Sequence, residues 1–197
     1  WMTRESFAAL LLFPLGIGAI FVPSTLPFAA AAAAAFLYCQ ARILQAAKGI
    51  PAWREPWLTP FLLATALAEG GGLFWVCATH HGVGTRPLLA VFGALVIVRM
   101  LAWLVYRRHV RGSAPPVRRA LDEAGRGLQY AGTLPPLLLV AIAAGGGLEG
   151  TGLLAVAAAA GICASAAGAW SKWSLITRAG FNQGFALAHL PVRGTRR

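Results

Sequence analysis

The chain has 197 residues, of which 58% are hydrophobic and 12% charged, and its formal net charge is +11. Soluble domains average about 25% charged residues, so this composition argues against a soluble domain. It favours a single all-α integral membrane domain over residues 1–197, a polytopic transmembrane helix bundle. Because the Lys and Arg residues cluster between long apolar blocks, membrane orientation explains the net charge and no nucleic-acid partner is expected.

Six apolar segments are long enough to cross a bilayer, which takes about 20 residues in a helix. In chain order they are roughly 5–22, 26–47, 58–79, 87–106, 127–146 and 152–171. The blocks show no alternation and are too long for strands. Pro135 and Pro136 predict a kink or break in the fifth span. Residues 107–126 are predicted to form a basic cytoplasmic loop, and 172–197 a cytoplasmic tail.

The basic residues gather on one side of this predicted bundle. Only Arg86 falls on the other side, and Arg99 falls within a span. The positive-inside rule therefore predicts that the basic side, with the C-terminus, faces the cytoplasm. We expect a multi-pass protein of the bacterial cytoplasmic (inner) membrane.

Glu69 and Arg99 are ionisable residues inside the third and fourth spans, which a short connection makes antiparallel. At ~1.5 Å per residue, Glu69 lies roughly 16 Å from the basic side and Arg99 roughly 10 Å, so the two side chains are expected to meet. The pair would be either a buried ion pair that fixes helix register or a polar site for a proton or a quinone head group. The glycines 70–72 would admit another helix or a ligand.

Arg4 and Glu5 stand at the mouth of the first span, on the basic side. A glutamate in a first helical turn interacts favourably with the helix dipole, and an arginine at a cytoplasmic helix end is ordinary. From the residues alone, a structural role is therefore the simpler interpretation of both.

No haem or metal is expected in this chain. The cysteines each lie alone in a different apolar block, without zinc or iron–sulfur spacing. A b-type haem needs two histidines at matched depth on facing helices, and no pair here meets that condition. The residues concerned are Cys39, Cys77, Cys163, His80, His81, His109 and His189.

Two stretches carry a resemblance to a known family. The opening "WMTRESFAALLLFPLG" resembles a motif of the membrane anchor subunits of DMSO-reductase-type molybdoenzymes, in the broad polysulfide-reductase/NrfD-like group. That motif has a Ser-Trp pair, a spacer, and an Arg-Glu or Asn-Glu pair, which here reads Trp1, Met2, Thr3, Arg4 and Glu5. The stretch 173–194, "WSLITRAGFNQGFALAHLPVRG", is similar to the end of the phenylacetyl-CoA:acceptor oxidoreductase-like branch.

The resemblance implies a quinone- or quinol-binding anchor that is not catalytic alone. It implies electron transfer between a membrane quinone, such as menaquinone, and a partner complex with an iron–sulfur subunit and a molybdopterin catalytic subunit, as in anaerobic respiration. By position, Glu5 would be the quinol-site residue. Arg4 would either orient Glu5 or stabilise a semiquinone anion, and Glu69 with Arg99 would be the second candidate site. Family anchors have more helices, so we expect a fragment that lacks its N-terminal part before Trp1.

Two alternatives remain open at this stage. A small ion-coupled transporter would use Glu69 and Arg99 at the midplane, with a helix break at the glycines 70–72. Such transporters tend to contain internal repeats, and none is clear between residues 1–80 and 87–171. A structural assembly subunit without any ligand is the other alternative.

Overall fold

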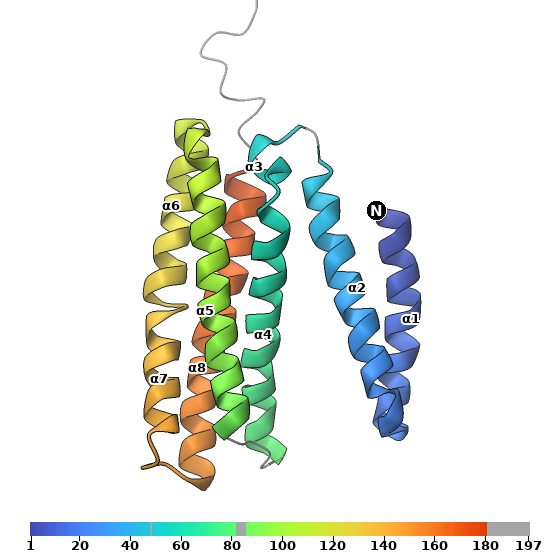
Figure 1. The fold of residues 1–197 in the computed structure, drawn as a ribbon, viewed down its shortest axis with the longest axis vertical. Coiled ribbons are helices and arrows are strands. Elements are labelled where there is room, and N and C mark those ends of the chain that lie inside the picture. The colour runs from blue at the N-terminus through green and yellow to red at the C-terminus, as the bar shows by residue number, and fades with distance from the viewer. Residues whose placement is uncertain (48, 82–85, 181–197) are drawn as a thin grey trace, which may run out of the picture.

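A computed structural model describes residues 1–47, 49–81 and 86–180 of the chain, and in these ranges the fold is all-α without strands (Figure 1). The helices are α1 (Met2–Phe21), α2 (Leu26–Gln45), α3 (Pro51–Arg54), α4 (Leu58–His81), α5 (Arg86–His109), α6 (Pro115–Tyr130), α7 (Leu134–Ala144) and α8 (Gly150–Trp173). Short 3-10 turns cover Pro23–Thr25 and Val110–Gly112, and a π-helical turn, η3, covers Ser174–Arg178. Six helical segments of the described chain are long and apolar enough to cross a membrane, which confirms the predicted fold class.

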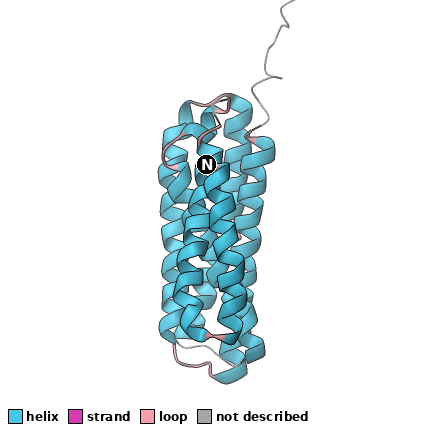
Figure 2. Cartoon of the chain, turned by 90° about the vertical axis from the view of Figure 1, so that its right-hand side faces the viewer, coloured by secondary structure: helices cyan, strands magenta, loops and turns pink. Residues whose placement is uncertain are grey.

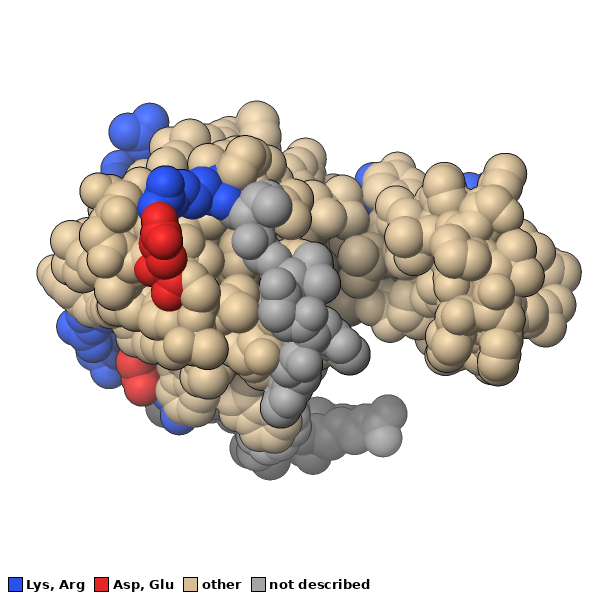
Figure 3. Space-filling model, turned by 90° about the horizontal axis from the view of Figure 1, so that it is seen from below, with Lys and Arg blue, Asp and Glu red and all other residues tan. Residues whose placement is uncertain are grey.

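The helices form two regions that meet at one end. Helices α4 to α8 make a compact bundle, whereas α1 and α2 form a hairpin beside it (Figure 1). Both regions run along the same long axis (Figure 2). The hairpin joins the bundle through contacts between α2 and α4. Seen from below, the hairpin stands as a separate mass with a narrow connection to the bundle (Figure 3).

Small residues let α4 and α8 approach closely at the centre of the bundle. A Cβ atom added to Gly72 would lie 2.6 Å from the carbonyl oxygen of Gly161, so a larger residue would force the helices apart. Ser165 Oγ also donates a hydrogen bond to the Glu69 carbonyl across this contact, at 3.2 Å. Such small-residue contacts are a common basis of helix association in membranes. Helix α4 runs unbroken through the glycines 70–72, so the helix break that the transporter alternative requires is absent there.

The fifth span begins earlier than the sequence predicted. Helix α6 starts at Pro115, so the predicted loop over 107–126 is wrong for most of its length. The segment nevertheless has a helical pattern, since its buried residues recur at intervals of three and four: Val117, Leu121, Ala124 and Leu128. The many basic residues between them led to the prediction of a loop. The helix stops at Tyr130 and resumes as α7 at Leu134, so the predicted break lies just before Pro135.

The predicted tail also begins too early. Lys172 belongs to α8, and the π-helical turn continues to Arg178. Residues 181–197 of that tail lie outside the described residues, with His189 and most of the stretch 173–194.

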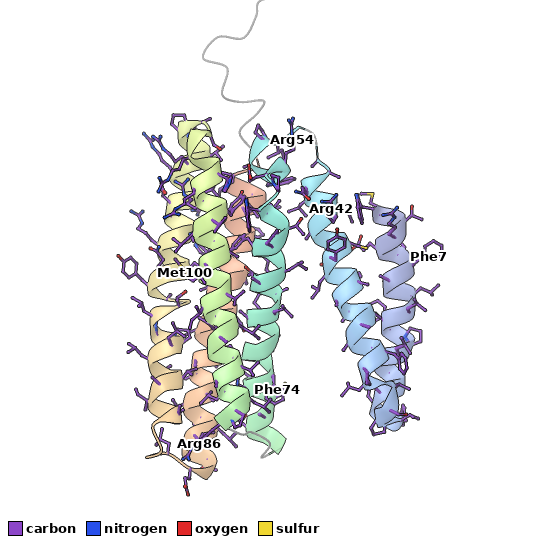
Figure 4. All side chains as sticks on the ribbon, viewed as in Figure 1. Phe7, Arg42, Arg54, Phe74, Arg86 and Met100 are labelled. Carbon is purple, nitrogen blue, oxygen red and sulfur yellow. The ribbon has the colours of Figure 1, made fainter. Side chains whose placement is uncertain are left out.

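The two ends of the molecule differ in charge. Arg42 and Arg54 lie at one end of the molecule, and Arg86 lies at the opposite end (Figure 4). Arg86 is the one Lys or Arg at its end among the described residues, and the view from below shows few charged side chains (Figure 3). We call the end with Arg42 and Arg54 the basic end.

Candidate functional site

A cavity of about 360 Å³ lies where the hairpin meets the bundle, close to the basic end. Helices α1, α2 and α4 line it, together with the end of α8 and its π-helical turn. Its apolar wall consists of Met2, Leu37, Ala41, Ile43, Leu44, Leu62, Ala66 and Ile176. Ligand pockets typically have volumes of about 300–1,000 Å³, with mostly apolar walls and a few polar groups. This cavity fits that description.

Glu5 lies in the cavity wall and is held from α2. Gln40 Nε2 donates a hydrogen bond to Glu5 Oε1 at 3.2 Å, and both residues line the cavity. The carboxylate is partly buried in the first turn of α1. Because the Gln40 amide fixes one carboxylate oxygen, the hairpin presents an oriented hydrogen-bond acceptor to the cavity.

Lys172 supplies a positive charge to the same cavity from α8. Its Nζ forms an ion pair with Glu69 Oε2, and the side chains of Lys172 and Glu69 are 34% and 15% exposed. A lysine near a helix end normally extends toward the membrane surface. Lys172 instead pairs with Glu69, which packs against α8 at Gly168, one turn before the lysine. The ion pair therefore keeps the ammonium group at the cavity instead of in bulk water.

Glu69 lies behind Lys172 and packs against the backbone of α8. A Cβ atom on Gly168 would lie 2.5 Å from Glu69 Oε1, so a larger residue at that position would displace the Glu69 side chain. Glu69 Oε1 is buried and has no hydrogen-bond partner among the described residues. Glu69 is thus joined to the cavity through Lys172, although it is not itself a lining residue.

Arg99 does not pair with Glu69, so that prediction is wrong. The side chain is fully buried. Its Nη1 donates to the Ala164 carbonyl at 2.7 Å and its Nη2 donates to the Gly132 carbonyl. Gly132 lies at the break between α6 and α7, where carbonyls lose their intrahelical partners. Since an unpaired carbonyl is costly in hydrocarbon, Arg99 compensates for that break.

Arg4 lies away from the cavity wall. Its guanidinium stands over the Trp1 ring at 4.7 Å, and that of Arg42 stands near the same ring at 5.0 Å. Glu5 is held by Gln40 rather than by Arg4. The predicted orienting role of Arg4 therefore finds no matching contact with Glu5 in the described structure.

Two cavity residues were missed by the sequence reading, Gln40 and Lys172. Each is a polar residue in a mostly apolar helix, and an intramembrane ionisable residue such as Lys172 is a functional candidate by default. Extending the sixth span by one or two residues would have placed Lys172 inside it. The sequence around Gln40 contains no signal that its amide contacts Glu5.

The chain has no significant match among protein-family models, curated proteins or solved structures. The chemistry of the cavity is therefore the basis for a functional proposal. It combines an acceptor held by Gln40, a cation held by Glu69, and apolar walls between them.

Proposed function

We propose that this protein is a quinone-reactive membrane anchor subunit that passes electrons between a membrane quinone and a partner iron–sulfur and molybdopterin oxidoreductase. The observation that supports this proposal is the cavity with Glu5 and Lys172 in one largely apolar wall. A quinone is a flat apolar ring with a polar oxygen at each of two opposite positions. It needs an apolar slot with one hydrogen-bonding group for each oxygen.

Glu5 and Lys172 divide the two oxygens between them in this proposal. Oxidation of a quinol to a quinone releases two electrons and two protons. The Glu5 carboxylate accepts a hydrogen bond from one hydroxyl and takes its proton, acting as a general base. It then releases that proton to water at the basic end. The proton of the second hydroxyl, at the Lys172 end of the ring, leaves to water, and the two electrons pass to the partner iron–sulfur subunit. Lys172 donates a hydrogen bond to the other oxygen and orients the ring.

The surroundings of the cavity suit a ligand that arrives from the bilayer. The hairpin presents mostly exposed apolar residues, such as Phe7, whose ring points away from α2 (Figure 4). In a membrane these side chains face lipid. A quinone dissolved in the lipid can thus reach the space between hairpin and bundle without crossing water, and its apolar tail can remain in the bilayer.

We place the basic end in the cytoplasm of a bacterial cell, by the positive-inside rule. The quinone site then lies near the cytoplasmic surface, and the partner subunits that receive the electrons dock there. A cytoplasmic substrate such as an acyl-CoA fits this arrangement better than an external one.

The transporter alternative gains no support from the contacts of its two proposed residues. Both terminal nitrogens of Arg99 donate to backbone carbonyls, those of Ala164 and Gly132, and Glu69 is paired with Lys172. The helix break that would open such a site is missing, because α4 continues through it. These contacts favour structural roles for Arg99 and for the glycines.

The test is a titration of membranes that contain the protein with a fluorescent quinol-analogue inhibitor. We expect saturable binding that Glu5→Gln weakens about tenfold, because a hydrogen bond to a charged group contributes about 1.5–3 kcal/mol. The matched control is Glu123→Gln, a carboxylate of α6 that pairs with Arg178 outside the cavity. Its binding should equal that of the wild type. Absence of saturable binding in the wild type would refute the proposal and favour an assembly or transport role.

A further inference from the structure

A second face of the bundle carries a polar groove, between α5 and α6. This cavity of about 320 Å³ is lined by Trp103, Leu104, Arg107, Asp122, Arg126 and Gln129, among others. Gly125 forms part of its floor, where a Cβ atom would lie 2.8 Å from the Trp103 ring. Glycine thus lets the two helices approach while their charged side chains line the groove between them.

The groove carries an excess of positive charge. Arg107 Nε donates to Asp122 Oδ1 at 3.1 Å, and its Nη2 contacts the same oxygen. Arg107 Nη1 is buried and has no partner among the described residues. Arg126 adds a second guanidinium to the wall. With one carboxylate against two guanidinium groups, the groove has an unused donor and a net charge that suit an anion.

An apolar cavity continues from the groove along the same face. It measures about 270 Å³ and is lined by Met100, Gln129, Tyr130, Thr133 and Leu134, where α6 ends and α7 begins. Gln129 lines both cavities. The break between the two helices therefore leaves an apolar space directly beside the polar one.

The depths of the two cavities match the layers of a bilayer. Arg107 lies 21 residues after Arg86, which is about 32 Å along α5 and close to the roughly 30 Å of a hydrocarbon core. Arg107 therefore stands at the level of lipid head groups. Met100 lies about 10 Å deeper, at the level of acyl chains.

We propose that this face binds one anionic phospholipid, such as phosphatidylglycerol. Its phosphate takes hydrogen bonds from Arg107 and Arg126, and an acyl chain occupies the cavity at Met100 and Leu134. Basic pockets between membrane helices are suited to anionic head groups. The site is separate from the quinone cavity and does not depend on the proposed function, because it uses α5, α6 and α7.

The test is native mass spectrometry of the purified protein with phosphatidylglycerol or phosphatidylcholine. We expect tighter binding of phosphatidylglycerol and a loss of about fivefold with Arg126→Gln, since one basic residue contributes about 1 kcal/mol near an anionic lipid surface. The matched control is Arg119→Gln, an exposed arginine of α6 that does not line the groove. It should bind like the wild type.

A second variant separates lipid binding from helix stability. Asp122→Asn removes the competing carboxylate and should strengthen phosphatidylglycerol binding, although it removes an ion pair of the fold. Weaker binding by this variant would overturn the proposal. So would equal losses with Arg126→Gln and Arg119→Gln, which would indicate diffuse attraction. Soluble glycerophosphoglycerol has the same head group without acyl chains. If it displaced bound phosphatidylglycerol as effectively as phosphatidylglycerol itself does, the acyl cavity would contribute nothing, and the proposal would be overturned too.

Discussion

The hairpin and the bundle are built from similar apolar helices but are held in different ways. In the bundle, large side chains such as Trp75 and Phe92 are buried, and glycines bring backbones into contact. In the hairpin, Ala8, Ala29, Cys39 and Ala41 are the buried residues of the two long helices. Many of its large residues, such as Phe7 and Phe13, are exposed and would face lipid in a membrane.

The difference shows why the cavity lies at the junction of the two regions. Lipid tails are as apolar as leucine, so helices in a bilayer gain stability from close packing rather than from burial as such. The bundle achieves that packing internally, whereas the hairpin comes close to the bundle only near the basic end (Figure 1). A space for a ligand remains where a well-packed wall faces a loosely packed one.

The largest expected effect contrasts the same substitution in the two regions. Phe92→Ala should lower the free energy of unfolding by about 3 kcal/mol, because it leaves a cavity inside the bundle. Phe13→Ala on α1, whose side chain is 66% exposed, should change it by less than about 0.5 kcal/mol. Denaturation by SDS in mixed micelles measures both. Equal losses would show that the hairpin is packed as tightly as the bundle.

A smaller effect is expected from one methyl group at the contact of α4 with α8. Gly72→Ala should destabilise the protein by about 2 kcal/mol, since its Cβ meets the Gly161 carbonyl. Gly70→Ala is the matched control, because nothing lies within 4 Å of its Cβ position. That variant should be neutral or slightly stabilising, as alanine favours a helix. The same unfolding assay decides, and a destabilised Gly70→Ala would contradict the packing described here.

The smallest effect concerns the ion pair at the junction. Lys172→Leu should cost about 1 kcal/mol, because Glu69 loses its partner but the pair is partly exposed. Adding Glu69→Gln should recover most of that loss. The double variant should still bind the quinol analogue more weakly, since the cavity has lost its cation. Wild-type binding by the double variant would remove Lys172 from the site.

Residue patterns were sufficient for the spans and for the separation of charge. Blocks of apolar residues of sufficient length are expected to be helices in a bilayer, because only a helix satisfies its own backbone there. The lengths of the apolar blocks predicted the six segments, and Pro135 predicted the nearby break. The positions of the Lys and Arg residues between the blocks predicted the basic end. The start of α6 was missed because the basic charges outweighed the helical spacing of Val117, Leu121 and Leu128.

The partners of the polar residues were decided by the tertiary structure. Depth along the membrane suggested that Arg99 and Glu69 meet, but depth does not determine which face of a helix points where. The apolar residues of α4 are not concentrated on one face, so its sequence does not indicate which side contacts α8. In the structure, the orientation of the helices about their axes places Glu69 beside Lys172. It also brings Arg99 to the Gly132 carbonyl, at the break between α6 and α7. The sequence determined which segments enter the membrane, and packing determined which side chains meet, because close contact depends on residues far apart in the chain.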